Sequence, residues 1–164
     1  NKTIFNDKLK IIIFGLFNPI GIDNKLSKYL KTDTSLFSNL RNLKKNKFRI
    51  SIFGNIYGNI DKTPVRDFIH IIDIINHVKE CIIKIDKIKN LKLFNICTGI
   101  GHSVKYIVDK FKLYHCKNLK IKYKKSRFGD LQSSIGNNKN IYDFTEIINK
   151  YKKNTLIKNL FFDL

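Results

Sequence analysis

Arg66 and Arg127 are the residues of this chain best suited to hold a phosphate group. They are two of four arginines in 164 residues, and the other basic residues are lysines. A planar guanidinium donates two parallel hydrogen bonds to a phosphate, and lysine replaces it poorly. Asn18 follows an apolar run and carries amide donors and a carbonyl acceptor at a strand end, where open α/β sheets bind ligands. The guanidinium groups could therefore hold a phosphate, and Asn18 could contact a ligand at the end of its strand.

Two other patterns suggest chemistry but are better explained without it. Residues 98–103 (TGIGHS) resemble a dinucleotide-binding turn, but Val104 replaces the third glycine and no acidic residue follows about 20 positions later. Tyr106 and Lys110 have the YxxxK spacing of a proton-transfer pair, but roughly one such match is expected by chance in so lysine-rich a chain. We interpret the first as a tight turn and the second as a coincidence on a helix face used for packing.

The cysteines and histidines predict neither a metal site nor a hydrolase triad. Cys81, Cys97 and Cys116 are an odd number without CxxC spacing, whereas disulfide scaffolds and zinc sites use paired, regularly spaced thiols. None of the four histidines has a nearby Ser or Cys and an orienting acid in a familiar local pattern. We expect the three cysteines to be reduced structural thiols.

Apolar runs and helical patterns alternate along the chain, which predicts an α/β fold. We expect strands at residues 11–17, 49–53, 66–72, 91–97 and 119–123. We expect helices at 34–46, 73–88, 103–114 and, near the end, 137–150 and 155–163. Thr34 or Ser35 is placed to cap the first helix and Asp73 the second. The intervening loops at 18–33 and 54–65 are long enough to indicate ligand binding.

The formal net charge of +19 has two interpretations. A nucleic-acid-binding surface is one. We favour a solvated lysine surface, because the lysines are scattered among abundant asparagine and isoleucine, as compositional drift would leave them. A hydrophobic content of 43% supports a folded core, and no run approaches the roughly 18 apolar residues of a membrane span. We therefore expect a soluble, cytoplasmic protein that binds neither membrane nor nucleic acid.

Three separated blocks of the sequence match the motifs of one known enzyme family. Residues 16–21 (LFNPIG) are similar to its YFNPxG. Residues 53–57 (FGNIY) and 63–73 (TPVRDFIHIID) are similar to FGNDY and GTGVRDYIHVxD, at the same spacing. Residues 94–104 (FNICTGIGHSV) and 127–130 (RFGD) are similar to YNLGTGxGxSV and RxGD. Together the blocks resemble the UDP-glucose 4-epimerases of the extended short-chain dehydrogenase family.

These blocks follow the family order over about residues 10–135, and the last 30 residues match loosely. The resemblance implies an α/β fold: the carboxy-terminal portion of a Rossmann-like NAD(P)-binding enzyme. That portion contains the last strands of its sheet and a small mixed α/β substrate domain. We expect residues 1–164 to form a single partial domain, the substrate-binding half, without the amino-terminal NAD-binding part.

The resemblance also implies roles for individual residues. Asn18, Arg66 and Arg127 would bind the phosphates, and Asp130 would accept hydrogen bonds from ribose hydroxyls. The other implied substrate contacts are Ser51 and Phe53 around the uracil, Ser134 near the sugar, and Thr34, Ser35 and Leu36 where the family has Asn-Leu. Phe17 and Pro19 would contact the cofactor. Asp67, His70 and Asp73 are expected to orient Arg66 and cap a helix rather than touch the ligand.

The implied activity is epimerisation of UDP-glucose and UDP-galactose at C4 through an NAD-dependent 4-keto intermediate, as in galactose metabolism. The NAD fingerprint and the catalytic Tyr and Lys would precede residue 1, so we expect this chain alone to bind a UDP-sugar without epimerising it. The chain contains no methionine, which indicates that it begins inside a longer reading frame. Its expected partners are the missing amino-terminal half and, in a homodimer, a second copy.

Other interpretations remain open. A nucleotide-sugar dehydratase or decarboxylase of the same family shares the Arg-Asp-Phe/Tyr strand, although the FGN-x-Tyr block favours the epimerase. A basic nucleic-acid-binding or assembly module could derive from such an enzyme, and so could a decayed gene fragment. Arg66, Arg127 and Asp130 are all retained, which argues against a pocket that has lost its substrate-binding residues.

Overall fold

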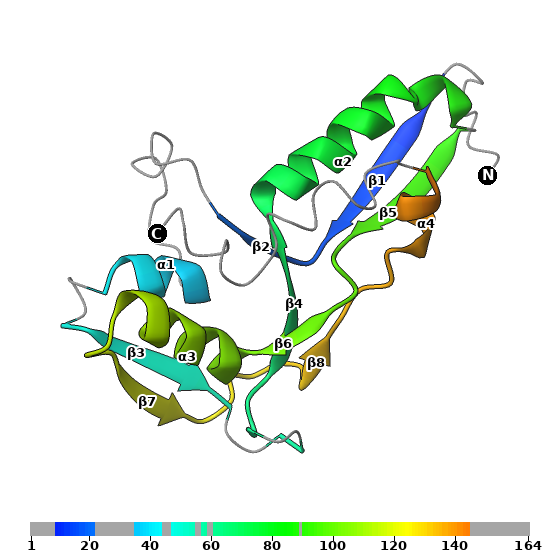
Figure 1. The fold of residues 1–164 in the computed structure, drawn as a ribbon. Coiled ribbons are helices and arrows are strands. Elements are labelled where there is room, and N and C mark those ends of the chain that lie inside the picture. The colour runs from blue at the N-terminus through cyan, green and yellow to red at the C-terminus, as the bar shows by residue number, and fades with distance from the viewer. Residues whose placement is uncertain are drawn as a thin grey trace.

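The structure is a computed structural model that describes residues 9–21, 35–43, 47–54, 57–58, 61–88 and 90–144. Thr34 and the helix expected at 155–163 lie outside these residues. Figure 1 shows the described elements as two groups, at opposite ends of the molecule, joined by the long strand β4 (Val65–His70). Among the described residues, no helix is long and apolar enough to cross a membrane.

The first group is built on two parallel strands, β1 (Ile11–Leu16) and β5 (Leu91–Ile96), paired from Ile11 opposite Leu91 to Leu16 opposite Ile96. Helix α2 (Ile71–Ile83), a short 3-10 helix (Ile85–Lys87) and helix α4 (Lys139–Phe144) accompany them. The strands are the predicted apolar runs. Cys81 of α2 and Ile141 of α4 pack with Phe14 and Phe94, so both helices cover the same face of the two strands.

The opposite face of β1 and β5 carries aliphatic side chains that are exposed. Ile13 is 45% exposed, Leu91 55% and Leu93 56%. Because successive strand residues point to opposite faces, these three lie on the face away from Phe14 and Phe94. Parallel sheets occur almost always with both faces covered, so two parallel strands with one bare aliphatic face are an incomplete layer.

The second group contains helix α1 (Leu36–Arg41), strand β3 (Arg49–Phe53), helix α3 (Val104–His115) and strand β7 (Lys120–Lys124). Strands β3 and β7 are parallel. Ile50 and Ile52 of β3 are buried together with Leu40 of α1 and with Ile107 and Phe111 of α3. Helix α3 agrees with the helix predicted at 103–114, and its buried residues Ile107 and Phe111 lie four positions apart on one helix face.

Strand β4 links the two groups and pairs with three short strands. It pairs in parallel with β2 (Asn18–Ile20) and β8 (Ser133–Ser134), and antiparallel with β6 (Gly101–Ser103). These strands of two or three residues lie in segments predicted as loops or turns. They are too short to show an alternating pattern, and their pairing with β4 is a tertiary contact.

Helices α1 and α2 end at Arg41 and Ile83, earlier than the predicted residues 46 and 88, and one of the two predicted caps differs. Ser35 caps α1 as expected, since its hydroxyl accepts from the Ser38 N–H at 3.2 Å. Strand β4 ends at His70 rather than residue 72, and the His70 ring nitrogen Nδ1 accepts from the Ile72 N–H at 3.2 Å. His70 therefore caps α2. The prediction that Asp73 does so is wrong, because Asp73 lies buried inside the first turn.

Candidate functional site

A cavity of about 380 Å³ lies where the second group of elements meets β2 and β4. Its volume is within the range typical of small-ligand sites. Asn18, Arg66 and Arg127, which come from three widely separated parts of the sequence, all line it. The expected convergence of two guanidinium groups and one amide is therefore present.

Most other predicted site residues also line this cavity. They are Phe17, Pro19, Ser35, Leu36, Ser51, Phe53 and Asp130. Ser134 is not among the lining residues; it lies in β8 directly opposite Arg66. Thr34 lies outside the described residues. The structure thus brings together ten of the twelve predicted positions.

Asn18 reaches the cavity because β2 runs beside β4. The Asn18 amide Nδ2 donates to the backbone carbonyl of Asp67 at 3.1 Å. Because the amide is planar, this bond to β4 also sets the direction of the second N–H and of the side-chain carbonyl of Asn18. The position of Asn18 is therefore set by strand pairing and not by its immediate neighbours in sequence.

Asp130 lies between the two arginines of the cavity. Its carboxylate accepts from Arg127 Nε at 3.1 Å and lies 3.9 Å from a terminal nitrogen of Arg66. Arg66 also donates to the backbone carbonyl of Val65 at 2.8 Å. The Arg66 and Asp130 side chains are largely buried, whereas that of Arg127 is 56% exposed. Arg66 is thus held in place, and Arg127 lies at the solvent side of the cavity.

The charges of this cluster keep Asp130 ionised. Burial raises the pKa of the Asp130 carboxyl, but hydrogen bonds from the Arg127 side chain and backbone, with the positive charges of both arginines, outweigh it. The resulting pKa lies below the ordinary value of 3.8. Two cations and one anion leave the cavity lining with a positive excess, which suits an anionic ligand.

Phe53 carries cationic groups over its ring. The Arg127 guanidinium carbon is 4.9 Å from the ring centroid, and the Lys124 ammonium is 5.4 Å from it. Both are cation–π distances. The aromatic face expected to flank a base is therefore present at the cavity wall, and in this structure it is in contact with cations.

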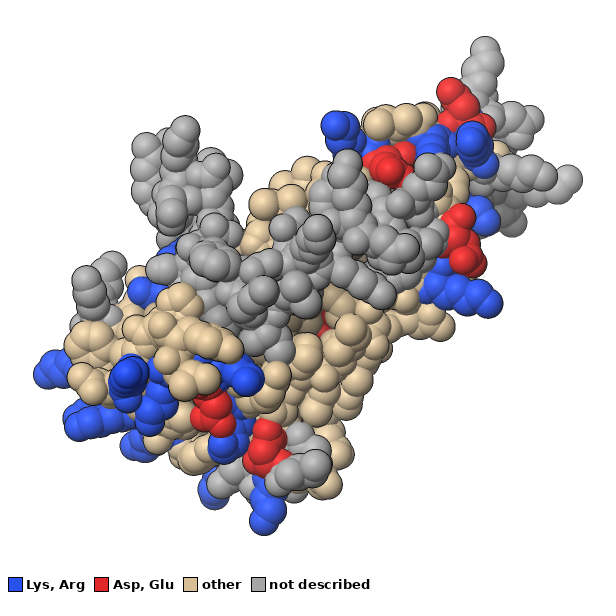
Figure 2. All heavy atoms as spheres, viewed as in Figure 1, with Lys and Arg blue, Asp and Glu red and all other residues tan. Residues whose placement is uncertain are grey.

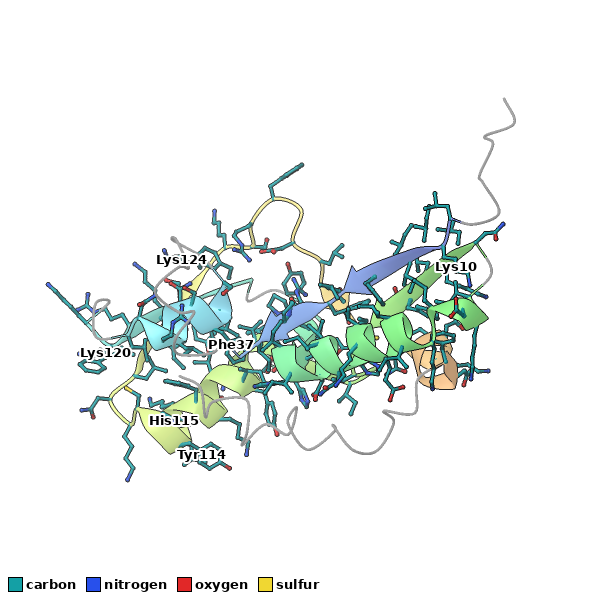
Figure 3. All side chains as sticks on the ribbon, turned by 90° about the horizontal axis from the view of Figure 1, so that it is seen from above. Lys10, Phe37, Tyr114, His115, Lys120 and Lys124 are labelled. Atoms are coloured by element: carbon teal, nitrogen blue, oxygen red, sulfur yellow. The ribbon has the colours of Figure 1, made fainter. Side chains whose placement is uncertain are left out.

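Six lining residues were not predicted: Phe37, Asn39, Ile50, Pro64, Phe68 and Val104. Pro64, Phe68 and Val104 belong to the sequence blocks that resemble the family, so those blocks could have indicated that they lie near the site. Phe37, labelled in Figure 3, packs its ring edge-on against Phe68 at 5.7 Å between centroids. Asn39 on α1 adds an amide to the cavity, with Nδ2 donating to the Ser35 carbonyl at 2.8 Å. The resemblance placed Ser35 and Leu36, at the start of α1, near the substrate, but nothing in the sequence indicated that Phe37 and Asn39 would also line the cavity.

Asp67 does not orient Arg66, contrary to the sequence prediction. Its buried carboxylate accepts from Thr98 N and Oγ1 at 2.9 and 2.6 Å, from Gly99 N at 2.8 Å and from Gly136 N at 3.2 Å. A carboxylate has acceptor capacity for such a cluster of donors. Asp67 therefore ties the turn after β5, and the segment before α4, to β4.

The same contacts explain the glycine-rich turn at 98–103. A dinucleotide site uses the N–H groups of such a turn to bind phosphate. Here the N–H groups of Thr98 and Gly99 already bind a protein carboxylate. Gly99 has φ +74°, a conformation that glycine tolerates best. The interpretation as a structural tight turn is consistent with this geometry.

Tyr106 and Lys110 do not line the cavity. Tyr106 stacks on His102 with 5.5 Å between ring centroids, and the Lys110 ammonium lies 5.5 Å from the centre of the Tyr106 ring. Tyr106 is exposed, so this face of α3 is surface and is not used for packing as expected. Within the described residues, no group of three or more His, Cys, Asp or Glu is arranged to hold a metal ion.

No protein-family model matches the chain, but comparisons with individual proteins find several UDP-glucose 4-epimerases. The UDP-glucose 4-epimerase of Dictyostelium discoideum is 35% identical over 138 residues, which cover 76% of this chain and 38% of that protein. The enzyme of Caenorhabditis elegans is 28% identical over 140 residues, covering 78% and 38%. The chain thus spans about two fifths of the length of these relatives.

Solved structures give the same result for the fold. A UDP-glucose 4-epimerase from Stenotrophomonas maltophila, with bound NAD and formylated UDP-arabinopyranose, matches 83% of this chain and 42% of its own, with a TM-score of 0.73 at 23% identity. A UDP-Glc/GlcNAc 4-epimerase from Campylobacter jejuni matches 94% and 47%, with a TM-score of 0.64 at 28% identity. The predicted mixed α/β fold with parallel strands is confirmed. In sequence and in fold, this chain is a relative of the UDP-glucose 4-epimerases that corresponds to part of their length.

Proposed function

We propose that this chain is the UDP-sugar-binding portion of an NAD-dependent UDP-sugar 4-epimerase of galactose metabolism. The observation that supports this most is the lining of one cavity by Asn18, Arg66 and Arg127. Each comes from a different sequence block, so their convergence is independent of the resemblance of any single block. A diphosphate is the part of a UDP-sugar that two guanidinium groups and an amide suit best.

The remaining contacts follow from the places of the lining residues. Asp130, ionised and between the arginines, would accept from ribose hydroxyls. The ring of Phe53 and the backbone of Ser51 would flank the uracil, which requires the guanidinium of Arg127 to leave the ring for the phosphates. Asn39 would supply the amide expected near residues 34–36. Ser134, beside Arg66 in β8, is proposed to lie near the sugar.

NAD is the proposed cofactor, and this chain would contribute a small part of its site. Phe17 and Pro19 line the cavity just after β1 and offer apolar surface on which the nicotinamide end could rest. When bound, NAD supplies reversible hydride transfer at C4 of the sugar. Within the described residues, this chain's role is to bind and orient the nucleotide end of the substrate.

The aliphatic face of β1 and β5 is the surface that we propose for the NAD-binding part. That part corresponds to the portion of the relatives that the chain does not match. Ile13, Leu91 and Leu93 would be buried by further strands and helices of the same sheet. We also propose the cytoplasm as the location, because Cys81, Cys97 and Cys116 are free thiols, as reducing compartments keep them.

Isothermal titration calorimetry of the protein containing this chain and its NAD-binding part tests the ligand. We expect UDP-glucose to bind, and Arg127→Ala to weaken binding by about 2 kcal/mol, roughly 30-fold, as for a lost charged hydrogen bond. Arg41→Ala is the matched control, because Arg41 ends α1 and does not line the cavity. Equal affinity of both variants for UDP-glucose would exclude Arg127 from the site.

A second substitution tests whether the NAD-binding part lies on the exposed aliphatic face of β1 and β5. Leu93→Lys should leave the stability of this chain alone nearly unchanged, because Leu93 is already half exposed. In the protein that contains the NAD-binding part, the same change should lower the unfolding temperature by several degrees, since it buries a charge. Leu113→Lys, at a comparably exposed position of α3, should be neutral in both. If the two substitutions behave alike, the cover does not lie on this face.

A further inference from the structure

The strand β7 carries three lysines on one face. Lys120, Lys122 and Lys124 alternate with Ile121 and Tyr123, and all three lysines are exposed. Since alternate strand residues share a face, the three lysines form a row whose α-carbons span about 13 Å at roughly 3.3 Å per residue. Residues 110–130 contain eight Lys and Arg and one acidic residue, so this row is the centre of a strongly cationic segment.

The register of β3 and β7 directs this row toward the cavity. Lys120 lies opposite Arg49, and Lys124 lies opposite Phe53. The other face of β3 packs into the core through Ile50 and Ile52. The cations therefore lie on the face away from the core, and the row ends at Phe53 in the cavity wall.

Little negative charge offsets the row. No ion pair joins these three lysines to a carboxylate of the described residues. Of the nearest acids in the sequence, Asp109 pairs with Lys105 and Asp130 with the cavity arginines. Figure 2 shows many Lys and Arg over the end of the molecule that contains β3, β7 and α3, with acidic groups among them.

The last lysine of the row connects it to the site. The Lys124 ammonium and the Arg127 guanidinium both lie over the ring of Phe53, at 5.4 and 4.9 Å from its centroid. Arg127 in turn shares Asp130 with Arg66. In Figure 3, Lys124 lies on the opposite side of the small sheet from Tyr114 and His115 at the end of α3. Cations thus continue from the exposed strand to the inner wall of the cavity.

We propose that Lys120, Lys122 and Lys124 form an electrostatic approach path that captures the anionic diphosphate ligand and speeds its entry into the cavity. The proposal depends on the proposed function for the identity of the ligand. It assigns a role to part of the lysine excess that the sequence analysis attributed to a solvated surface. A polyanion such as RNA is the less suitable ligand, because the row is short and ends at a cavity of about 380 Å³, which accepts a small molecule.

The expected effect is on the association rate and depends on salt. Steering by a whole charged surface raises association rates about 10- to 1000-fold. Salt screens the attraction beyond about 3 Å at 1 M, but only beyond about 30 Å at 0.01 M. Neutralising three charges near the entrance should remove part of this gain, about 3- to 10-fold at 0.01 M salt. The dissociation rate should change less than the association rate, because the three lysines do not line the cavity and only Lys124 contacts its wall, through the Phe53 ring.

Stopped-flow measurements with fluorescently labelled UDP test this on the protein containing this chain and its NAD-binding part. The test variant is Lys120→Gln, Lys122→Gln and Lys124→Gln combined. The control combines Lys79→Gln, Lys87→Gln and Lys92→Gln, which remove the same charge from exposed positions at the other end of the molecule. We expect the test variant to associate about 3- to 10-fold more slowly at 0.01 M salt, and the difference to vanish near 1 M.

Each other outcome overturns the proposal in a distinct way. An equal loss of association rate in both variants would mean that net charge matters and position does not. A faster dissociation at unchanged association would make the lysines direct contacts. Tight RNA binding that the test variant loses, without a change in UDP association, would make the row a nucleic-acid surface. If the unaltered protein fails to bind labelled UDP at any salt concentration, the proposed function itself is wrong.

Discussion

Replacing Asp67 by asparagine is the substitution that most directly tests how this fold is held together. The Asp67 carboxylate is fully buried and accepts four hydrogen bonds from Thr98, Gly99 and Gly136. The Asp67 backbone carbonyl also accepts from the amide of Asn18 in the cavity. Asparagine keeps the size of the side chain, but one of its two terminal atoms becomes a donor.

The cost can be worked out from these contacts. In either orientation of the new amide, at least one backbone N–H faces the NH₂ group and loses its acceptor, which costs about 1–3 kcal/mol. The hydrogen bonds that remain lose the charge of their acceptor, about 1 kcal/mol each. Relief from burying a charge offsets part of this loss. We expect the free energy of unfolding to fall by about 2–4 kcal/mol, a large part of the roughly 5–15 kcal/mol of a typical domain.

Urea unfolding followed by circular dichroism measures this difference. Asp109→Asn is the control, because Asp109 is partly exposed and pairs with Lys105 one turn away on the same helix. A pair of this kind contributes about 0.5 kcal/mol or less. If Asp67→Asn destabilises the protein no more than Asp109→Asn, the buried carboxylate does not hold the turn after β5, and the account of that turn is wrong.

Three further predictions concern packing, titration and thiol reactivity. Gly136→Ala should lower the free energy of unfolding in urea by about 1–3 kcal/mol, because the added Cβ would clash with the sulfur of Cys97. Gly58→Ala is the control and should change it little, because the nearest neighbour of its Cβ would be 3.7 Å away. Burial lowers the pKa of His77 below 6.5, although the carboxylate of Glu80 opposes this. The stability that neutral His77 contributes above pH 6.5 should therefore be lost as the pH falls through the lowered pKa. In thermal unfolding, His77→Gln should lose less stability than the unaltered protein over the same pH range. Burial raises the pKa of the Cys97 thiol to about 11. At about pH 8 a thiol reagent should therefore modify the partly buried Cys116 in the native protein, and the buried Cys81 and Cys97 only after unfolding. Rapid modification of native Cys116→Ser would contradict this.

The candidate cavity shows which parts of a site sequence patterns can reveal. Asn18, Arg66 and Arg127 were predicted because each lies in a block whose order and spacing are distinctive, and because arginine is rare in this chain. Asn39 and Phe37 were missed because α1 reaches the cavity through packing that leaves no pattern within the helix itself. Motifs identify site residues at the ends of strands. Packing decides which residues of a helix from another part of the chain line the same site.

Asp67 illustrates the same division within one motif. Its place beside Arg66 suggested an ion pair, because neighbours in sequence are the partners that a motif displays. In a strand, however, adjacent side chains point to opposite faces. Arg66 therefore faces the cavity and Asp130, while Asp67 faces the turn at Thr98 and Gly99. The backbone alternation of β4, and not the motif, assigns each side chain its partner.

The amino-acid sequence by itself determined the class of the fold, the strands β1, β3, β5 and β7, and the residue types suited to a diphosphate, because apolar periodicity and side-chain chemistry are local properties. The tertiary structure decided the rest: the short strands around β4, the role of Asp67 and the alignment of the β7 lysines with the cavity. These features depend on pairing between segments that are tens of residues apart. Hydrogen bonds and charges of that kind form when the chain has folded, so no local pattern encodes them.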